Sequence, residues 1–206
     1  MKLLILGAAG KTGRLLVAQA LASGNTVTGF VRSHDGEAVT IPGITTIIGD
    51  ARNVADLQKA LKGQDAVIST LGSSKPGDRV IAASTASLVT AARSQRIRRV
   101  IIMSSFLVAD NFQPNLVVKF ALKLMGSIVA DFKSGEQLLA SSDLDYTIVY
   151  ATRLTNDPLN SQYQIVDTNN TVGGSESISR ANVAEFLLKQ LSDNTYIRKT
   201  VLITRK

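Results

Sequence analysis

The chain contains no cysteine, and this absence excludes several kinds of chemistry at once. Without cysteine there is no disulfide framework, no thiolate metal site and no cysteine nucleophile. The absence fits a reducing compartment, so we expect a cytoplasmic protein with no bound metal.

Long apolar runs are also missing. No uncharged apolar stretch approaches the roughly 18 residues that a membrane-spanning helix requires, so we expect no membrane span. The N-terminal run MKLLILGAAG is short, contains glycines and is followed at once by Lys11 and Arg14. It therefore indicates mature structure rather than a signal peptide.

Acidic residues are fewer than basic residues. The 206 residues include 16 Asp and Glu against 23 Lys and Arg, which gives a formal net charge of +7. Such a chain attracts anions, whether nucleic acids, acidic membrane surfaces or phosphorylated small molecules, and charge alone does not choose among them. Hydrophobic residues make up 45%, and this length and composition predict one globular domain over 1–206.

Apolar runs alternate with helical patterns along the whole chain, at the spacing of βαβ units. This order predicts an α/β fold, a doubly wound parallel sheet with helices on both faces. Residues 151–178 show no periodicity and are rich in Thr, Asn, Ser and Gly, so we expect a small lobe of loops and short strands over the strand ends. We expect strands at 2–6, 26–32, 44–50, 65–72, 98–105, 145–150 and 200–205. We expect helices at 13–23, 54–63 (capped by Asn53), 79–95, 116–141 (mostly helical, with Gly126 as a candidate break) and 179–191 (capped by Ser179).

The stretch LLILGAAGKTGRLL carries three glycines, each three residues from the next, directly after the first strand and at the start of a helix. This is the position of a dinucleotide cradle. Gly7 would make the turn, Gly10 would admit the phosphates beside Ala9, and Gly13 would let the helix pack on the sheet. Lys11 and Thr12 would add contacts to phosphate. The alternative is a glycine turn that binds no ligand.

The end of the second strand indicates which dinucleotide is bound. An NAD-selective site has an acid there, but here the chain reads FVRSHDG, with Arg32 in that place. A guanidinium suits a 2′-phosphate and favours NADPH over NADH. The alternatives are that Arg32 is a solvated loop charge, or that Asp35, further into the loop, acts instead. His34, the single histidine, is assigned no catalytic role because it lies at the adenosine end.

Two more strand ends carry groups that suit a dinucleotide. Asp50 and Ala51 follow the third strand, where they can meet the adenine edge. Leu71, Gly72 and Ser73 follow the next strand, where a corner of small residues would pass the cofactor toward its nicotinamide. Ligands in such sheets bind outside the carboxyl ends of the strands, so these positions support one another.

These segments resemble a known family. GAAGKTGRLL, the VR at 31–32, GDARNVADLQKALKGQDAVISTLG and SISRANVAEFLLKQL are similar to the atypical short-chain dehydrogenase/reductases, in particular the NAD(P)H-binding group that includes biliverdin reductase B (flavin reductase) and the NmrA-like proteins. The resemblance covers nearly the whole chain. It implies a Rossmann-type fold, NADPH binding and hydride transfer to flavins, quinones or similar planar acceptors, while some members bind the cofactor as sensors.

The resemblance also implies catalytic positions. Conventional members carry Tyr-x-x-x-Lys; here Lys133 stands at the lysine position, but Val129 replaces the tyrosine. Ser104 or Ser105 would be the serine facing the substrate, unless both serve turns or caps. Relatives have Arg-Pro where this chain has Tyr150-Ala151, and Tyr150 is a candidate phenol from the opposite wall.

Without the tyrosine, flavins and quinones are the favoured acceptors because they can take their proton from water. We therefore expect an NADPH-dependent oxidoreductase acting on a small planar acceptor. The alternative is a cofactor-sensing regulatory protein with little turnover. Chemistry on nucleotide sugars, as in related extended enzymes, is disfavoured because the C-terminal part is short.

Two remaining segments bear on partners. The basic run RSQRIRR (93–99) is expected to be a solvated turn at the end away from the cofactor rather than a nucleic-acid surface. The amphipathic segment 116–129 is expected to cover the substrate side, with Phe120, Leu124 and Met125 inward; contact with a membrane surface or a partner is the alternative. The oligomeric state is open, with a monomer favoured.

Overall fold

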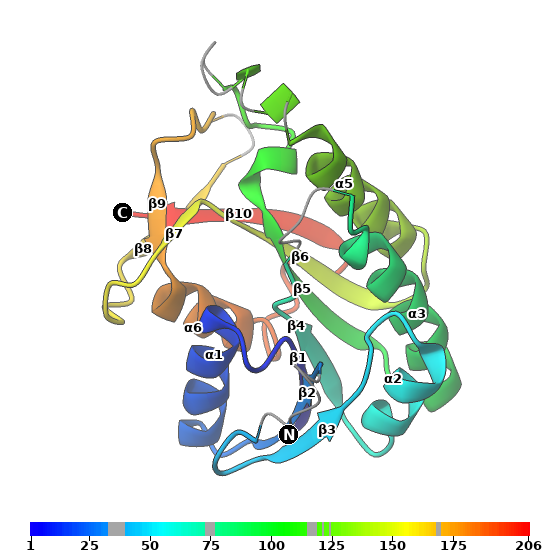
Figure 1. Cartoon of the computed structure of the whole chain (residues 1–206). Coiled ribbons are helices and arrows are strands. Elements are labelled where there is room, and N and C mark those ends of the chain that lie inside the picture. The colour runs from blue at the N-terminus through cyan, green and yellow to red at the C-terminus, as the bar shows by residue number, and fades with distance from the viewer. Residues whose placement is uncertain (33–39, 73–76, 115–118, 121, 124, 168–169) are drawn as a thin grey trace.

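An eight-stranded sheet forms the centre of the computed structural model, which describes residues 1–32, 40–72, 77–114, 119–120, 122–123, 125–167 and 170–206. The strand order is β3-β2-β1-β4-β5-β6-β10-β8 (Figure 1). The chain therefore starts in the middle of the sheet and winds outward in both directions, so the predicted doubly wound α/β fold is confirmed. The strands are β1 (Lys2–Leu6), β2 (Thr26–Val31), β3 (Thr45–Ile48), β4 (Ala66–Ser69), β5 (Arg99–Ser105), β6 (Asp145–Ala151), β8 (Tyr163–Val166) and β10 (Lys199–Arg205).

Helices cover both faces of the sheet because the central strands are apolar on both sides. In β1, Leu4 and Leu6 pack into one hydrophobic cluster, while Leu3 and Ile5 pack into another on the opposite face. The second face carries α1 (Lys11–Ala22) and α6 (Arg180–Lys189), and the first carries α2 (Val54–Leu61), α3 (Val80–Gln95) and α5 (Gly126–Ala140) (Figure 1). None of the helices in these described ranges is long and apolar enough to cross a membrane.

The segment 151–178 contributes to two sheets. β7 (Arg153–Thr155) and β9 (Ser177–Ser179) form a separate parallel pair. β8 instead extends the main sheet and runs antiparallel to β10, with Tyr163 opposite Arg205 and Val166 opposite Leu202. No described helix carries the chain back between β7 and β8, so β8 starts at the carboxyl end of the sheet and must run in reverse.

The predicted helix starts are confirmed where side chains cap them. Asn53 Oδ1 accepts hydrogen bonds from the backbone amides of Ala55 and Asp56 at the start of α2. Ser179 Oγ accepts from the amide of Asn182 at the start of α6.

The inward orientation expected for Phe120 and Met125 is wrong. Phe120 is 69% exposed and Met125 is 37% exposed, while Leu124 lies outside the described residues. A turn at Met125 separates α5 from the helical residues before it. The buried face of α5, which includes Gly135 and Leu139, therefore does not continue into the preceding turn.

The start of α3 is capped from a distant helix. Its own N-terminal residue, Arg79, has a left-handed backbone (φ 38°) and provides no side-chain cap. The buried carboxylate of Asp131, on α5, instead accepts hydrogen bonds from the amides of Ile81 (3.0 Å) and Ala82 (2.9 Å). This contact joins the two helices that cover β5 and β6.

Replacing Asp131 with alanine is expected to lower the free energy of unfolding by about 2–3 kcal/mol, because two buried amides lose a charged acceptor. Urea denaturation measures the loss. The control is Asp143→Ala, which removes a solvent-exposed ion pair with Arg93 and should change stability little. Equal losses in the two variants would contradict the capping role.

Candidate functional site

The glycine loop after β1 has the geometry of a tight turn under a helix. Gly7 has φ +77°, a backbone conformation that side chains with a Cβ rarely adopt. A Cβ built on Gly13 would lie 2.1 Å from the carbonyl oxygen of Gly7, so α1 packs against the loop at a distance that only glycine permits. A Cβ on Gly10 would meet only that same oxygen, at 3.2 Å.

The N-terminus of α1 is suited to an anion. Its N-cap residue is Gly10, so no side chain caps the helix, and its first turn has no acidic residue. The amides of this turn therefore face the loop without a competing carboxylate. Arg14 Nε donates to the carbonyl oxygen of Ala9 (3.0 Å) and braces the loop from the helix side.

A cleft of about 460 Å³ opens beside this loop, at the carboxyl ends of β1 to β4. It brings together predicted residues from all four strand ends: Gly7, Ala9, Gly10, Arg32, Asp50, Ala51, Leu71 and Gly72. Lys11, Thr12 and Gly13 lie just behind this lining, in the first turn of α1, where Lys11 is exposed and Thr12 is buried. Ser73, His34 and Asp35 lie outside the described residues.

Several residues that the sequence patterns did not predict also line the cleft. They are Phe30, Val31, Gly49, Arg52, Asp78 and Val80. A Cβ on Gly49 would lie 2.7 Å from Phe30 Cζ, so the ring of Phe30 packs directly on this glycine. The sequence carried one sign of this close packing, the glycine at position 49 directly before Asp50.

Asp50, which is predicted to meet the adenine edge, forms an ion pair with Arg52. Arg52 donates to both of its carboxylate oxygens, from Nε at 3.0 Å and from Nη2 at 2.6 Å. The hydrogen bond from Arg52 lowers the pKa of Asp50, although partial burial opposes it, and Arg32 lowers it further through its charge. Two guanidinium groups, Arg32 and Arg52, therefore line the cleft near the Asp50 carboxylate, and Asp78 is a second carboxylate in the same lining.

Further along the sheet, the hydroxyls of Ser104 and Tyr150 meet at one carboxylate. Ser104 Oγ donates to Glu136 Oε1 (2.5 Å), and Tyr150 OH donates to Glu136 Oε2 (2.7 Å). Burial raises the pKa of Glu136, while the two hydrogen bonds and the charge of Lys133 oppose that rise. Burial and the nearby Glu136 also raise the pKa of Tyr150.

Glu136 was missed, although its position on α5 pointed inward. It follows Phe132 by four residues and precedes Leu139 by three, which places all three on one helix face. Lys133 lies off this face and is exposed. Val129 is half-buried and packs against the core.

Ser105 serves a turn, which was the structural alternative for this serine. Its Oγ accepts a hydrogen bond from the amide of Leu107 (3.3 Å) and caps the short 3-10 helix η1 (Phe106–Val108). Of the two candidate serines, Ser104 is the one that joins the polar cluster.

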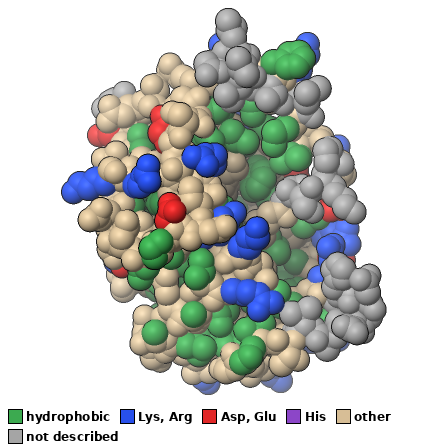
Figure 2. Space-filling view, turned by 60° about the vertical axis from the view of Figure 1, so that its left-hand side comes forward, with side chains coloured by type: hydrophobic (Ala, Val, Ile, Leu, Met, Phe, Trp, Pro, Cys, Tyr) green, Lys and Arg blue, Asp and Glu red, His purple; other side chains and the backbone are tan. Residues whose placement is uncertain are grey.

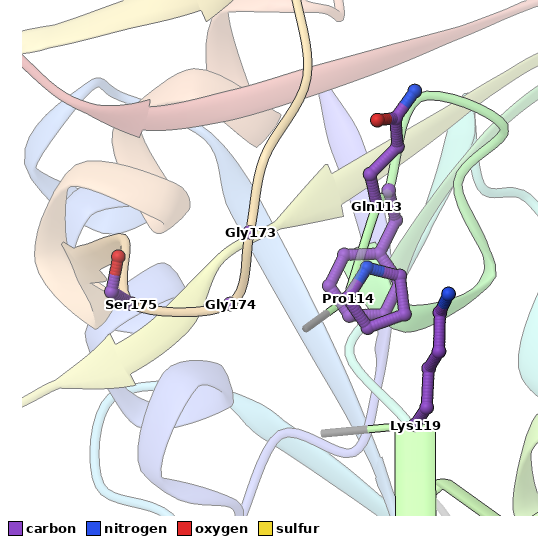
Figure 3. A pocket seen from close by; sticks show the side chains of 7 residues that line it. Gln113, Pro114, Lys119, Gly173, Gly174 and Ser175 are labelled. Carbon is purple, nitrogen blue, oxygen red and sulfur yellow. The ribbon is translucent and has the colours of Figure 1, made fainter. Parts of the chain in front are cut away.

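A second cavity, of about 770 Å³, lies beyond the end of β5. On one side stand Gln113, Pro114 and Lys119, and across from them runs the chain segment Gly173–Ser175 (Figure 3). Phe112, which also lines it, packs edge-to-face on Phe106 of η1, with 5.1 Å between the ring centroids. The cavity therefore combines apolar rings with one ammonium group.

Basic side chains are also spread over the face shown in Figure 2, consistent with the net charge of +7.

Known proteins resemble this chain over nearly its full length. The family model described as NAD(P)H-binding matches residues 7–194. The yeast protein YMR090W (UPF0659, Saccharomyces cerevisiae) is 27% identical over 214 residues, which cover 98% of this chain and 92% of that protein.

Two solved structures share the fold at low sequence identity. A short-chain dehydrogenase/reductase from Veillonella parvula, in complex with NADP, is 24% identical with a TM-score of 0.80 and covers 98% of this chain and 93% of its own. ChuY, an anaerobilin reductase from Escherichia coli O157:H7, is 21% identical with a TM-score of 0.80 and covers 100% of this chain and 97% of its own. The match over residues 7–194 confirms the resemblance, and the chain therefore belongs to the NAD(P)H-binding family and has the Rossmann-type fold of its oxidoreductases.

Proposed function

We propose that the protein is an NADPH-dependent reductase that transfers hydride to a small planar acceptor such as a flavin or a quinone. One observation carries the proposal: a single cleft is lined both by the glycine loop at the uncapped N-terminus of α1 and by Arg32. These are two separate groups of phosphate donors, as a phosphorylated dinucleotide requires.

Different residues of the cleft would bind different parts of the cofactor. The loop at Gly7 and Gly10 and the first-turn amides of α1 would hold the pyrophosphate. Arg32 would hold the 2′-phosphate, because the charge of Arg52 is already paired with Asp50. The ribose next to the nicotinamide would lie against Gly72. A Cβ built on Gly72 would meet no protein atom within 4 Å, so the space beside it is open to a ligand.

When bound, NADPH supplies the hydride, and the chain must hold the acceptor beside it. The cavity lined by Phe112 and Pro114 offers apolar walls against which a planar ring could stack. Ser104 would stand at the reacting end as a hydrogen-bond donor. The absence of a phenol at Val129 favours acceptors that do not need a tyrosine as acid, and the reductase among the structural neighbours agrees with this direction of chemistry.

Purified protein is expected to oxidise NADPH in the presence of FMN, FAD or a quinone from a panel, and to bind NADPH more tightly than NADH. Loss of reduced-nicotinamide absorbance measures turnover, and quenching titrations measure binding. Tight NADPH binding without turnover on any acceptor would contradict the reductase proposal.

That outcome would favour the second candidate, a cofactor-sensing regulatory protein. The specific observation on its side is that Lys133 is exposed, while Ser104 and Tyr150 both donate to an internal carboxylate. Binding alone does not separate the two candidates, because both require it.

A further inference from the structure

A continuous chain of hydrogen bonds runs through the interior between β5, α5 and β6. Ser104 and Tyr150 donate to opposite oxygens of the Glu136 carboxylate, so the carboxyl group connects the two hydroxyls directly. Ser104 is 5% exposed and Tyr150 is 8% exposed, so both hydroxyls are shielded from bulk water, while the Glu136 side chain between them is half-buried. A carboxyl group between two hydroxyls is able to receive a proton on one oxygen and release one from the other.

One end of this chain lies at the same end of the sheet as the proposed site, although Ser104 does not itself line the cofactor cleft. Ser69 of β4 pairs with Ile102 of the parallel strand β5. Leu71 and Ser104 each follow these residues by two positions, so they lie at the same end of the sheet. Leu71 lines the cleft of the cofactor. Ser104 is therefore the member of the chain nearest to the reacting end.

The other end lies at a separate groove. Tyr150 lines a groove of about 390 Å³ over β6, β10 and β8, together with Asp110, Asn111 and Thr200. Asp110 is exposed, and its charge raises the pKa of both Glu136 and Tyr150, so it stands close to the inner groups while open to water. The groove and the cleft of the cofactor have no lining residue in common.

We propose that Tyr150, Glu136 and Ser104 form a proton relay that carries protons from this groove to the acceptor, in place of the tyrosine that is missing at Val129. The relay rests on the proposed reductase function. Ser104 would touch the acceptor, while Glu136 and Tyr150 act through it.

The step balances as follows. Hydride transfer leaves the acceptor with one negative charge, and the O–H bond of Ser104 breaks as its proton passes to the acceptor oxygen. When Glu136 is protonated, its hydrogen lies on Oε1 and is donated to Ser104 Oγ, which reverses the hydrogen bond that Ser104 makes to the carboxylate and frees the Ser104 hydrogen for the acceptor. This carboxyl hydrogen then passes to Ser104 Oγ, and Glu136 becomes a carboxylate. Tyr150 OH passes its proton to that carboxylate and recovers one from water in the groove. The net transfer is one proton from water to acceptor.

The surroundings of Glu136 determine when it holds a proton. Burial and the charge of Asp110 raise its pKa, while Lys133 and the two hydroxyls lower it, with burial the largest influence. Asp131, on the same helix, is turned toward the amides of α3. Because the pKa is raised, Glu136 stays protonated to a higher pH than an exposed glutamate. The rate that depends on the relay should therefore fall as pH rises through that pKa.

The relay is tested with Glu136→Gln, Ser104→Ala and Tyr150→Phe, against the control Gln137→Ala, which removes an exposed side chain from the adjacent position on α5. With a quinone as acceptor, kcat of Glu136→Gln should fall on the order of 100-fold while KM changes little. Its pH profile should lose the falling limb, and Gln137→Ala should keep the profile of the unaltered protein. An unchanged profile in Glu136→Gln would overturn the proposal.

A second readout does not depend on turnover. The difference between infrared spectra of the unaltered protein and Glu136→Gln isolates the carboxyl stretch of Glu136. In D₂O this band should shift quickly in the unaltered protein and slowly in Tyr150→Phe, because the entrance to the groove has lost its hydroxyl. Equal exchange rates would overturn the relay even if the reductase is active. Failure of the reductase proposal would instead appear as absent NADPH oxidation in the unaltered protein, with the exchange difference retained.

Discussion

Replacing Gly13 with alanine is expected to destabilise the whole fold. The new Cβ would lie 2.1 Å from the carbonyl oxygen of Gly7 and 2.9 Å from Ala8 Cα, and both are backbone atoms that no rotamer change can move. Either α1 shifts away from β1 or the loop deforms. We expect a loss of about 3–5 kcal/mol, which corresponds to a fall in Tm of roughly 10 °C for a domain of this size.

Thermal denaturation followed by circular dichroism measures this loss. The matched control is Gly126→Ala at the start of α5, where an added Cβ meets no atom within 4 Å. In an ordinary helical conformation that change should leave stability unchanged or raise it by up to about 1 kcal/mol. A Gly13→Ala variant as stable as Gly126→Ala would show that the packing of α1 on the loop does not require glycine.

Replacing Arg32 with glutamate is expected to weaken NADPH binding about 100-fold while changing NADH affinity only a few-fold. A charge-assisted hydrogen bond to phosphate contributes about 1.5–3 kcal/mol, and the substituted carboxylate adds repulsion. NADH lacks the 2′-phosphate and so loses neither contribution. Added salt should narrow the difference because Arg32 is exposed.

Titration of each dinucleotide by fluorescence measures these affinities. Arg98→Glu is the control: Arg98 is paired with Asp145 at the amino end of β6, the edge of the sheet opposite the cleft. It makes the same change in net charge and should leave both affinities almost unaltered. If Arg32→Glu weakens the binding of NADPH and NADH equally, Arg32 does not bind the 2′-phosphate.

Much of the architecture could be predicted because local signals and burial agree. The run Leu3–Leu6 is apolar on both faces, as only a strand between two layers of helices would be. Asn53 and Ser179 cap helices through bonds to amides two or three residues away, so their roles depend on the adjacent sequence alone. Gly7, Arg32 and Asp50 each follow a strand, and parallel strands bring their carboxyl ends to one edge.

Other features depended on contacts between distant segments. Phe120 belongs to an amphipathic pattern, but a turn at Met125 interrupts the helix and leaves its ring in solvent. Asp131 caps α3 from another helix, because the packing of α3 on α5 places its carboxylate at the amides of Ile81 and Ala82. The antiparallel direction of β8 depends on the end of the sheet at which the chain re-enters it. The amino-acid composition of β8 does not indicate this direction.

The candidate site also has features that the sequence predicts and features that only the folded structure shows. The amino-acid order alone predicts the glycine turn before α1, because a glycine turn followed by a helix is a local structure, and the strand ends converge wherever such a sheet forms. The partners of the polar groups are another matter. Asp50 is held by Arg52, and Ser104 and Tyr150 are joined by Glu136, each through side-chain geometry set by packing. Residues 32 and 14 positions apart from Glu136 meet there, and only the folded sheet brings residues from two strands and a helix within hydrogen-bonding distance of one half-buried carboxyl group.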